Sequence, residues 1–280
     1  MAHSIKTVYV IHHSHTDIGY TDLQERVIDT QVNYIKTVLS MMEQPANAGF
    51  RWNCETLFCV EEFWKSAMAE EQAAFLRLAA EGKIGLSANY LNFTDLVDCS
   101  VYRERLNRWQ QCLGAHGAAM RTAMMADING ISMGQRDAML ANGVEFLYTN
   151  IHTHHGMYPL YQNQKPYFWE NENGQRLLVW NGEHYNLGNA LGIVLNKNVN
   201  FMTENYFGKK NGDVTGLLEN LHTNLAASIK EYEENGYPYD FYITSVSGVF
   251  SDNAPINPAI ADTVALFNEK YGEEVTMHMV

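Results

Sequence analysis

Short apolar runs alternate with longer amphipathic stretches along the whole chain. The apolar runs have the length of strands, as in Thr7-Val8-Tyr9-Val10-Ile11, and the amphipathic stretches repeat their apolar residues at helical spacing. We predict strands near residues 7–11, 50–55, 84–90, 123–127, 145–150, 176–181, 241–246 and 275–279. We predict helices over residues 21–43, 58–81, 101–114, 133–142, 216–235 and 258–271, the first opened by Thr21 and Gln24 as a capping box.

Strands that alternate with helices are typical of a mostly parallel sheet wrapped by helices. Seven or eight such strands predict a β/α barrel, and 280 residues is an ordinary length for a barrel built as one domain over 1–280. The stretches 151–175 and 182–215 lack this pattern and are predicted to be long loops. Both follow predicted strands, and loops of this length in a compact domain are usually functional or disordered.

Charge and cysteine content narrow the class of protein. Nineteen basic against 32 acidic residues give a net charge of −13, which repels phosphate backbones, so we expect no nucleic-acid partner and a neutral substrate. The four cysteines show neither CxxC spacing nor the density of a disulfide scaffold, so we expect them to stay reduced. The N-terminus lacks the pattern of a signal peptide, and no stretch reads as a membrane span. Together these features predict a cytoplasmic protein.

Metal-capable side chains follow the first predicted strand in the run His12-His13-Ser14-His15-Thr16-Asp17. Side chains alternate faces in an extended chain, so His13, His15 and Asp17 can project to one side and hold one ion. A histidine-rich turn with solvated rings is the alternative interpretation. The carboxyl end of the strands is where a barrel enzyme keeps its chemistry, and this favours the metal site.

Acidic or histidine side chains recur where the predicted strands stop. They are Asp17, Glu55, Asp95, Asp127, His152, His184 and Asp252. Asp127 ends a buried-strand pattern and leads into a predicted helix, so its carboxylate can bind metal or act as a nucleophile. An ordinary turn is the alternative, because Asp-x-Asn-Gly is also turn chemistry.

Several of these segments resemble glycoside hydrolase family 38, the zinc-dependent α-mannosidases. His15-Thr16-Asp17-Ile18-Gly19-Tyr20 is similar to the family's His-x-Asp-x-Gly-Trp signature, and Asp127-Ile128-Asn129-Gly130-Ile131-Ser132 stands where the family has Asp-Pro-Phe-Gly-His-Ser. Between them, Phe50 to Glu55 and the segment leading to Tyr90 and Asp95 follow in the family's order. The resemblance is clear to about residue 150 and thinner beyond it.

This resemblance implies a distorted barrel with one zinc ion held by His15, Asp17 and Asp127, and a fourth ligand from downstream domains that complete the site. It implies an α-mannosidase that retains configuration through a glycosyl-enzyme intermediate on Asp127, with Asp252 as the acid/base candidate ahead of Glu55 or Asp95. For an oligosaccharide or small glycoside substrate we expect contacts from Tyr20, Glu55, Tyr90, Asp95, His152 and His184. Tyr20 replaces the motif tryptophan, and Ile131 replaces the motif histidine. These departures concern the substrate more than the metal.

Two other classes of function compete with this one. A metal-dependent amidohydrolase also uses a His-x-His such as His13-Ser14-His15, but it needs a ligating Lys or His at the middle strand, where this chain has Asp127. A polysaccharide deacetylase shares an Asp/His metal site, but its His-x-x-x-His ligand pair has no convincing counterpart. The remaining alternative is a carbohydrate-binding relative that kept the fold and lost turnover.

Overall fold

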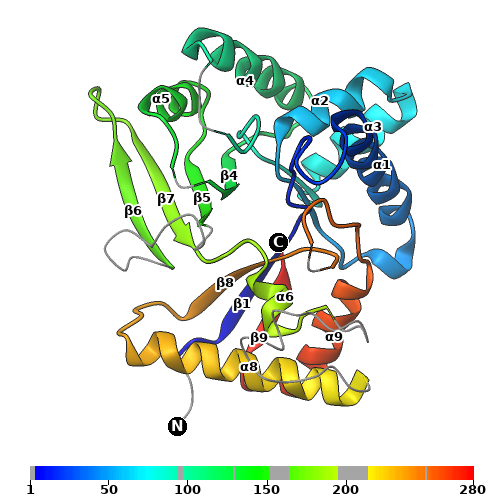
Figure 1. Ribbon diagram of the computed structural model, residues 1–280, viewed down its shortest axis with the longest axis vertical. Coiled ribbons are helices and arrows are strands. Elements are labelled where there is room, and N and C mark those ends of the chain that lie inside the picture. Colours follow the sequence, from blue (N-terminus) through cyan, green and yellow to red (C-terminus); the bar gives the residue numbers. More distant parts are fainter. Residues whose placement is uncertain (1–3, 94–96, 129, 152–163, 195–213, 250) are drawn as a thin grey trace.

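A computed structural model describes residues 4–93, 97–128, 130–151, 164–194, 214–249 and 251–280. Within these ranges the chain is an α/β fold, with helices around most of the strands, while β6 and β7 lie at the left-hand edge of the view (Figure 1). The strands are β1 (Thr7–His12), β2 (Trp52–Cys54), β3 (Ile84–Leu86), β4 (Thr122–Asp127), β5 (Phe146–Ile151), β6 (Lys165–Glu170), β7 (Arg176–Gly182), β8 (Phe241–Val246) and β9 (Thr276–Met279). The helices are α1 (Gln24–Met42), α2 (Leu57–Ser66), α3 (Ala69–Ala80), α4 (Cys99–Gly114), α5 (Met133–Ala141), α6 (Leu187–Leu191), α8 (Val214–Glu234) and α9 (Ala259–Tyr271), with a 3₁₀ turn at Pro45–Asn47.

The described strands form three small sheets, ordered β8-β1-β9, β2-β3 and β4-β5-β7-β6. All pairings are parallel except β6 with β7. Single bridges join the sheets, from His13 to Asn53 and from Ser87 to Thr122. The mostly parallel α/β prediction is therefore confirmed, whereas the hydrogen-bonded strands of the described residues do not close into a barrel.

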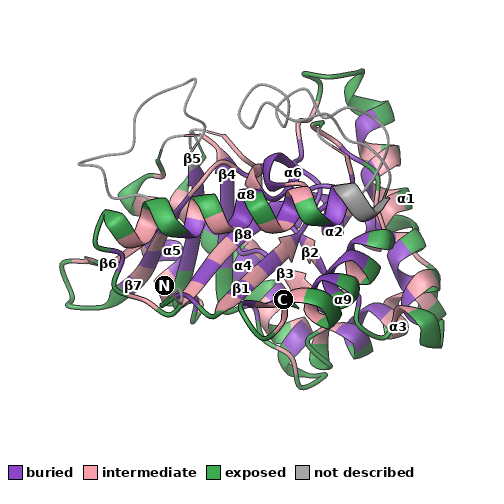
Figure 2. Cartoon of the chain, turned by 90° about the horizontal axis from the view of Figure 1, so that it is seen from below, coloured by how far each residue is buried: buried purple, intermediate pink, exposed green. Residues whose placement is uncertain are grey.

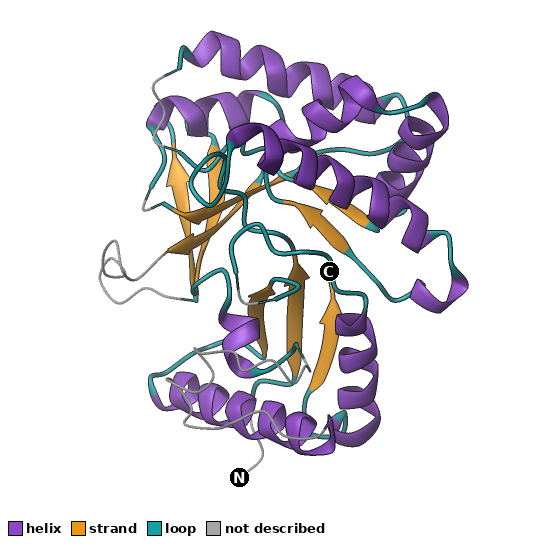
Figure 3. Ribbon diagram, turned by 45° about the vertical axis from the view of Figure 1, so that its right-hand side comes forward, coloured by secondary structure: helices purple, strands orange, loops and turns teal. Residues whose placement is uncertain are grey.

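Two clusters of buried apolar side chains hold the helices against the sheets, and Figure 2 shows burial concentrated on the strands and on the inward faces of the helices. One cluster packs α1 to α5 against β2, β3, β4, β5 and β7. The other packs α6, α8 and α9 against β1, β8 and β9, and Figure 3 shows α8 and α9 on the outer side of this sheet. None of the described helices is both long and apolar enough to cross a membrane.

Local features correct several boundaries. The predicted helix 58–81 is two helices, because Ala67 and Met68 have extended backbone between them. The predicted loops 151–175 and 182–215 contain β6 and α6. Pro166 fits β6 because this strand lies at the sheet edge, where a missing N–H donor can be tolerated. The predicted capping box of α1 is wrong, since Leu23 is the N-cap and no side chain caps it.

Candidate metal centre and active site

The segment that leaves β1 divides its three histidines between the core and the site. His12 is fully buried against the aromatic rings of Phe50 and Trp52, with ring centroids at 5.2 and 5.0 Å. Burial, with a smaller effect from neighbouring His13, lowers the pKa of His12 to about 3. His12 is therefore a neutral core residue at neutral pH, while His13 and His15 face Glu55.

Glu55 follows β2 and is the buried anchor of the site. Its carboxylate accepts hydrogen bonds from His13 Nδ1 at 2.5 Å, His15 Nδ1 at 2.9 Å and the backbone N–H of Thr16 at 3.1 Å, and also from the amide of Asn92. Burial acts to raise the pKa of Glu55, but the charges and hydrogen bonds of His15 and His13 hold it well below its usual value. Because these contacts saturate a carboxylate that is only 3% exposed, Glu55 positions His15.

His15 presents its second ring nitrogen to a group of carboxylates. With Nδ1 bound to Glu55, Nε2 is buried, lies 3.7 Å from Asp17 Oδ1, and has no hydrogen-bond partner among the residues that the structure describes. Burial acts to lower the pKa of His15, but Glu55, Asp17 and Asp252 together raise it to about 9. The orphaned nitrogen thus faces negative charge, and this is the environment that a bound cation requires.

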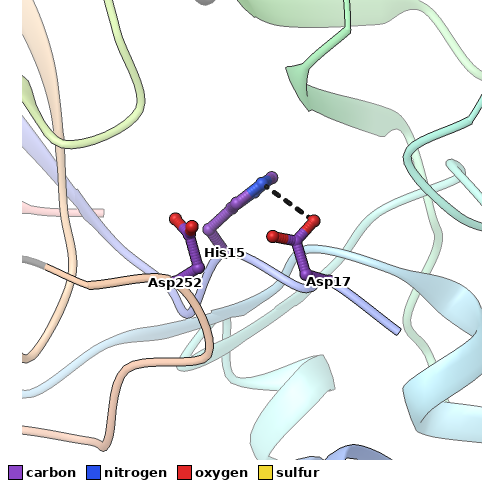
Figure 4. A group of neighbouring side chains, drawn as sticks. All are labelled: His15, Asp17 and Asp252. Atoms are coloured by element: carbon purple, nitrogen blue, oxygen red, sulfur yellow. Dashed lines mark ion pairs between the residues drawn. The ribbon is translucent and has the colours of Figure 1, made fainter. Parts of the chain in front are cut away.

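His15, Asp17 and Asp252 each offer one ligand atom, and these atoms all lie within 4.8 Å of one another. Figure 4 shows Asp17 and Asp252 on either side of His15, with the ion pair to Asp17 dashed. Burial raises the pKa of Asp17, His15 opposes this, and Asp252, Asp127 and Glu55 raise it further. An unpartnered imidazole nitrogen beside crowded carboxylates fits a divalent cation, and this nitrogen and oxygen donor set suits zinc.

Asp127 ends β4 with a φ of 72°, a left-handed conformation that is uncommon for residues other than glycine. Its charge raises the pKa of Asp17 and of Tyr185, so its carboxylate lies near both residues. It stands outside the 4.8 Å group of His15, Asp17 and Asp252. Strained backbone of this kind costs about 1–3 kcal/mol and clusters at functional sites.

Tyr185 is a site residue that the sequence analysis missed. Its ring stacks on His15 at 4.0 Å and on His184 at 4.3 Å. Its hydroxyl donates to Asp252 Oδ1 at 2.9 Å, and its carbonyl oxygen lies 3.1 Å from His13 Nε2. Its place directly after the strand-end residue His184 was the available signal. The predicted site residue His184 therefore stacks on Tyr185, which in turn stacks on His15.

The other predicted substrate contacts among the described residues do not lie together in the group around His15. Tyr20 is 87% exposed, and Tyr90 donates its hydroxyl to Glu61 at 3.1 Å under the guanidinium of Arg105. Glu55 is buried behind His15, as described above. Asp95 and His152 lie outside the described residues.

Residues 6–251 match the family model described as the glycosyl hydrolases family 38 N-terminal domain. The chain belongs to glycosyl hydrolase family 38. A comparison with curated proteins finds no match. The family 38 match includes His15 and Asp17 of the geometric group, and Asp252 lies one position beyond its end.

Solved structures support the family 38 fold. An α-mannosidase from Enterococcus faecalis V583 has a TM-score of 0.67 at 16% identity, with 98% of this chain and 28% of that one covered. A family 38 protein from Enterococcus faecalis has a TM-score of 0.63 at 13% identity, with 100% and 26% covered. The 4-alpha-glucanotransferase from Thermococcus litoralis reaches 0.50 at 10% identity, with 100% and 39% covered. At these identities the likeness concerns the fold, and the chain spans less than a third of the two Enterococcus proteins.

Proposed function

We propose that this chain is the catalytic domain of a zinc-dependent α-mannosidase that retains the configuration of the sugar. The observation that carries the proposal is the convergence of the unpartnered His15 Nε2 with Asp17 and Asp252, in a chain of family 38. Family membership favours this reading over an amidohydrolase or a deacetylase. The α-mannoside substrate is proposed from the printed description of the Enterococcus α-mannosidase and from the signature around His15.

His15 and Asp17 are the proposed metal ligands from the loop after β1, with Asp127 as a further ligand from the end of β4. The His15 ring is already oriented, since Glu55 accepts a hydrogen bond from Nδ1 and leaves Nε2 as the atom that would bind the metal. An outer carboxylate that fixes a ligating histidine in this way raises its basicity and its affinity for metal. When bound, zinc would supply a Lewis-acid centre for hydroxyls of the sugar ring.

Asp127 and Asp252 are the proposed pair of catalytic carboxylates. Asp127 attacks the anomeric carbon, and its C–O bond forms as the glycosidic bond breaks. Asp252 gives its proton to the leaving oxygen, then takes one from the water that releases the sugar from Asp127. Tyr185 holds Asp252 by a 2.9 Å hydrogen bond. Burial raises the pKa of Tyr185, and the charges of Asp252 and Asp127 raise it further, which supports their placement around one small space.

Chemical rescue separates the two carboxylate roles. With an aryl α-mannoside, Asp127→Ala should lose turnover, and azide should restore it with an inverted glycosyl azide as product. Asp252→Ala should keep turnover of substrates with good leaving groups, and azide should give a product of retained configuration. Wild-type protein that binds the sugar without turnover would instead favour the carbohydrate-binding alternative.

Asp252 has two candidate roles, because it also belongs to the geometric group of metal-capable residues. An acid/base role predicts that Asp252→Asn keeps zinc at one ion per chain. A ligand role predicts that the same substitution releases it, as His15→Ala should. Zinc content by elemental analysis after dialysis distinguishes the two roles.

We also propose a cytoplasmic location. All four cysteines are free, and Cys54 and Cys59 are buried. Unpaired buried thiols are usual in proteins of reducing compartments. Fractionation of the source cells with a compartment marker tests this location.

A further inference from the structure

The side chain of Asn253 ties the loop after β8, which carries Asp252, to the loop after β1, which carries His15 and Asp17. Asn253 Nδ2 donates to the carbonyl oxygen of Asp17 at 2.9 Å and to Thr21 Oγ1 at 2.8 Å. Its Oδ1 accepts from the backbone N–H of Asp17 at 3.4 Å. The side-chain amide of Asn253 therefore forms hydrogen bonds with both the N–H and the carbonyl oxygen of Asp17, although the two residues are 236 positions apart in the sequence.

The backbone of Asn253 extends this junction. Its N–H donates to the carbonyl oxygen of His15 at 2.7 Å, and its carbonyl oxygen accepts from the hydroxyl of Tyr34 at 3.0 Å. The residue has a φ of 48°, in the left-handed region that asparagine tolerates better than most residues. This conformation lets one residue hold His15 with its backbone and Asp17 with its side chain.

Gln31 reaches into the junction from α1. Its side chain is buried, and Nε2 donates to Asn253 Oδ1 at 2.9 Å and to Ser14 Oγ at 3.2 Å. With Gln31 in place, each polar atom of Asn253 has a partner, and the amide cannot flip without placing a donor against a donor. The orientation of Asn253 is therefore fixed from the helix side.

Position in the chain links this junction to the chemistry. Asn253 directly follows Asp252, so the bonds that fix Asn253 to His15 and Asp17 also fix where the loop after β8 presents Asp252. Gly248, near the start of this loop, allows the backbone of Pro255 to approach closely, since a Cβ at Gly248 would lie 1.7 Å from the carbonyl oxygen of Pro255. The close placement of Asp17, His15 and Asp252 thus depends on these contacts of Asn253 and Gly248 as well as on the bonds of their own side chains to Glu55 and Tyr185.

We propose that Asn253, held by Gln31, is a positioning residue that fixes Asp17 relative to His15 and thereby sets the affinity of the site for zinc. The proposal rests on the proposed metal-dependent function. Residues that orient ligands in this way typically contribute about 10–100-fold to metal affinity.

The test uses Asn253→Gly, because glycine keeps the left-handed backbone without strain and removes only the side-chain bonds. Gln31→Met is the second variant, since it retains a long unbranched side chain and removes the donor. Asn268→Ala is the matched control, because Asn268 also holds both backbone polar groups of one residue, Met277, with bonds of 2.8 and 2.7 Å, and it lies on α9 away from the site. Zinc affinity is measured by calorimetry on EDTA-treated full-length chain, and unfolding without metal is measured for each variant.

We expect Asn253→Gly to weaken zinc binding about 10–100-fold, and Gln31→Met to weaken it less. The double variant should bind no more weakly than Asn253→Gly, because both act through one contact. Asn268→Ala should lower stability without changing zinc affinity. Zinc binding by Asn253→Gly within about twofold of wild type would overturn the proposal. If wild type itself binds no zinc, the proposed function fails instead, so the two failures are distinguishable.

Discussion

Replacing Glu55 by glutamine tests how the site is held together, because it keeps the shape of the side chain and removes its charge. The carboxylate accepts from both His13 Nδ1 and His15 Nδ1, and an amide of the same shape turns an N–H toward one of these donors. His15 then loses the strongest of the interactions that raise its pKa to about 9. The protonated ring should lose its preferential stabilisation in the folded protein.

The size of this effect follows from the pKa of His15. A rise from 6.5 to about 9 in a buried side chain corresponds to about 3 kcal/mol of stability in metal-free protein, at about 1.4 kcal/mol per pKa unit. Since the folded-state pKa is the higher one, this contribution is fully present below pH 6.5 and is lost as the pH rises through about 9. About 2 kcal/mol of it should disappear between pH 6.5 and 8.5. Glu55→Gln should remove this pH dependence and lower stability at pH 6.5 by about 3 kcal/mol.

The assay is urea unfolding in EDTA at pH 6.5, 7.5 and 8.5, followed by tryptophan fluorescence. Glu61→Gln is the control, because Glu61 is also buried but its partners are Arg105, Arg108, Tyr90 and Trp109, none of which is a histidine. This control should lose stability and keep the wild-type slope with pH. The reasoning is refuted if Glu55→Gln retains that slope.

Three further outcomes follow from the same structure. Zinc binding at pH 7 should release about one proton, since the metal displaces the proton of His15. Calorimetry in buffers of different ionisation enthalpy measures the number of protons released, and a value near zero would mean that His15 is not a ligand. Gly248→Ala should destabilise the protein by about 1–3 kcal/mol because its Cβ would meet the backbone of Pro255, whereas Gly114→Ala, which meets nothing within 4 Å, should be neutral or stabilising in urea unfolding. His12→Leu should reduce the loss of stability from pH 6.5 to pH 5 by about 2 kcal/mol, because His12, with a pKa lowered to about 3, takes up a proton only on unfolding in this range. Urea unfolding that shows the same loss of stability between these pH values as the wild type would contradict this prediction.

The strands and helices with regular apolar spacing could be predicted from the sequence, and the irregular ones could not. Each of the predicted strands has its counterpart in the structure, although β2 and β3 are shorter than predicted. The break between α2 and α3 was missed because the apolar pattern continues across Ala67. Strand β6 was missed because Pro166 is usual in a loop and is tolerated only by an edge strand. Whether a strand lies at an edge depends on the sheet order, which a local pattern does not contain.

The site divides in the same way between local motifs and long-range contacts. His15, Asp17 and Asp127 were identified from short segments at strand ends, and the structure brings the first two together with Asp252. The roles of Tyr185, Asn92 and Asn253 depend on hydrogen bonds to residues far away in the chain, such as that of Tyr185 with Asp252. Thr21 illustrates the difference, since its place suggested a helix cap and its hydroxyl instead accepts from Asn253.

Anomalous diffraction at the zinc absorption edge, from crystals of the full chain grown with zinc, tests the central claim most directly. We predict one strong peak about 2.0–2.2 Å from His15 Nε2 and within the same range of a carboxylate oxygen of Asp17. A peak that avoids His15, or none at all while His15 Nε2 is hydrogen-bonded to Asp17, would contradict the account.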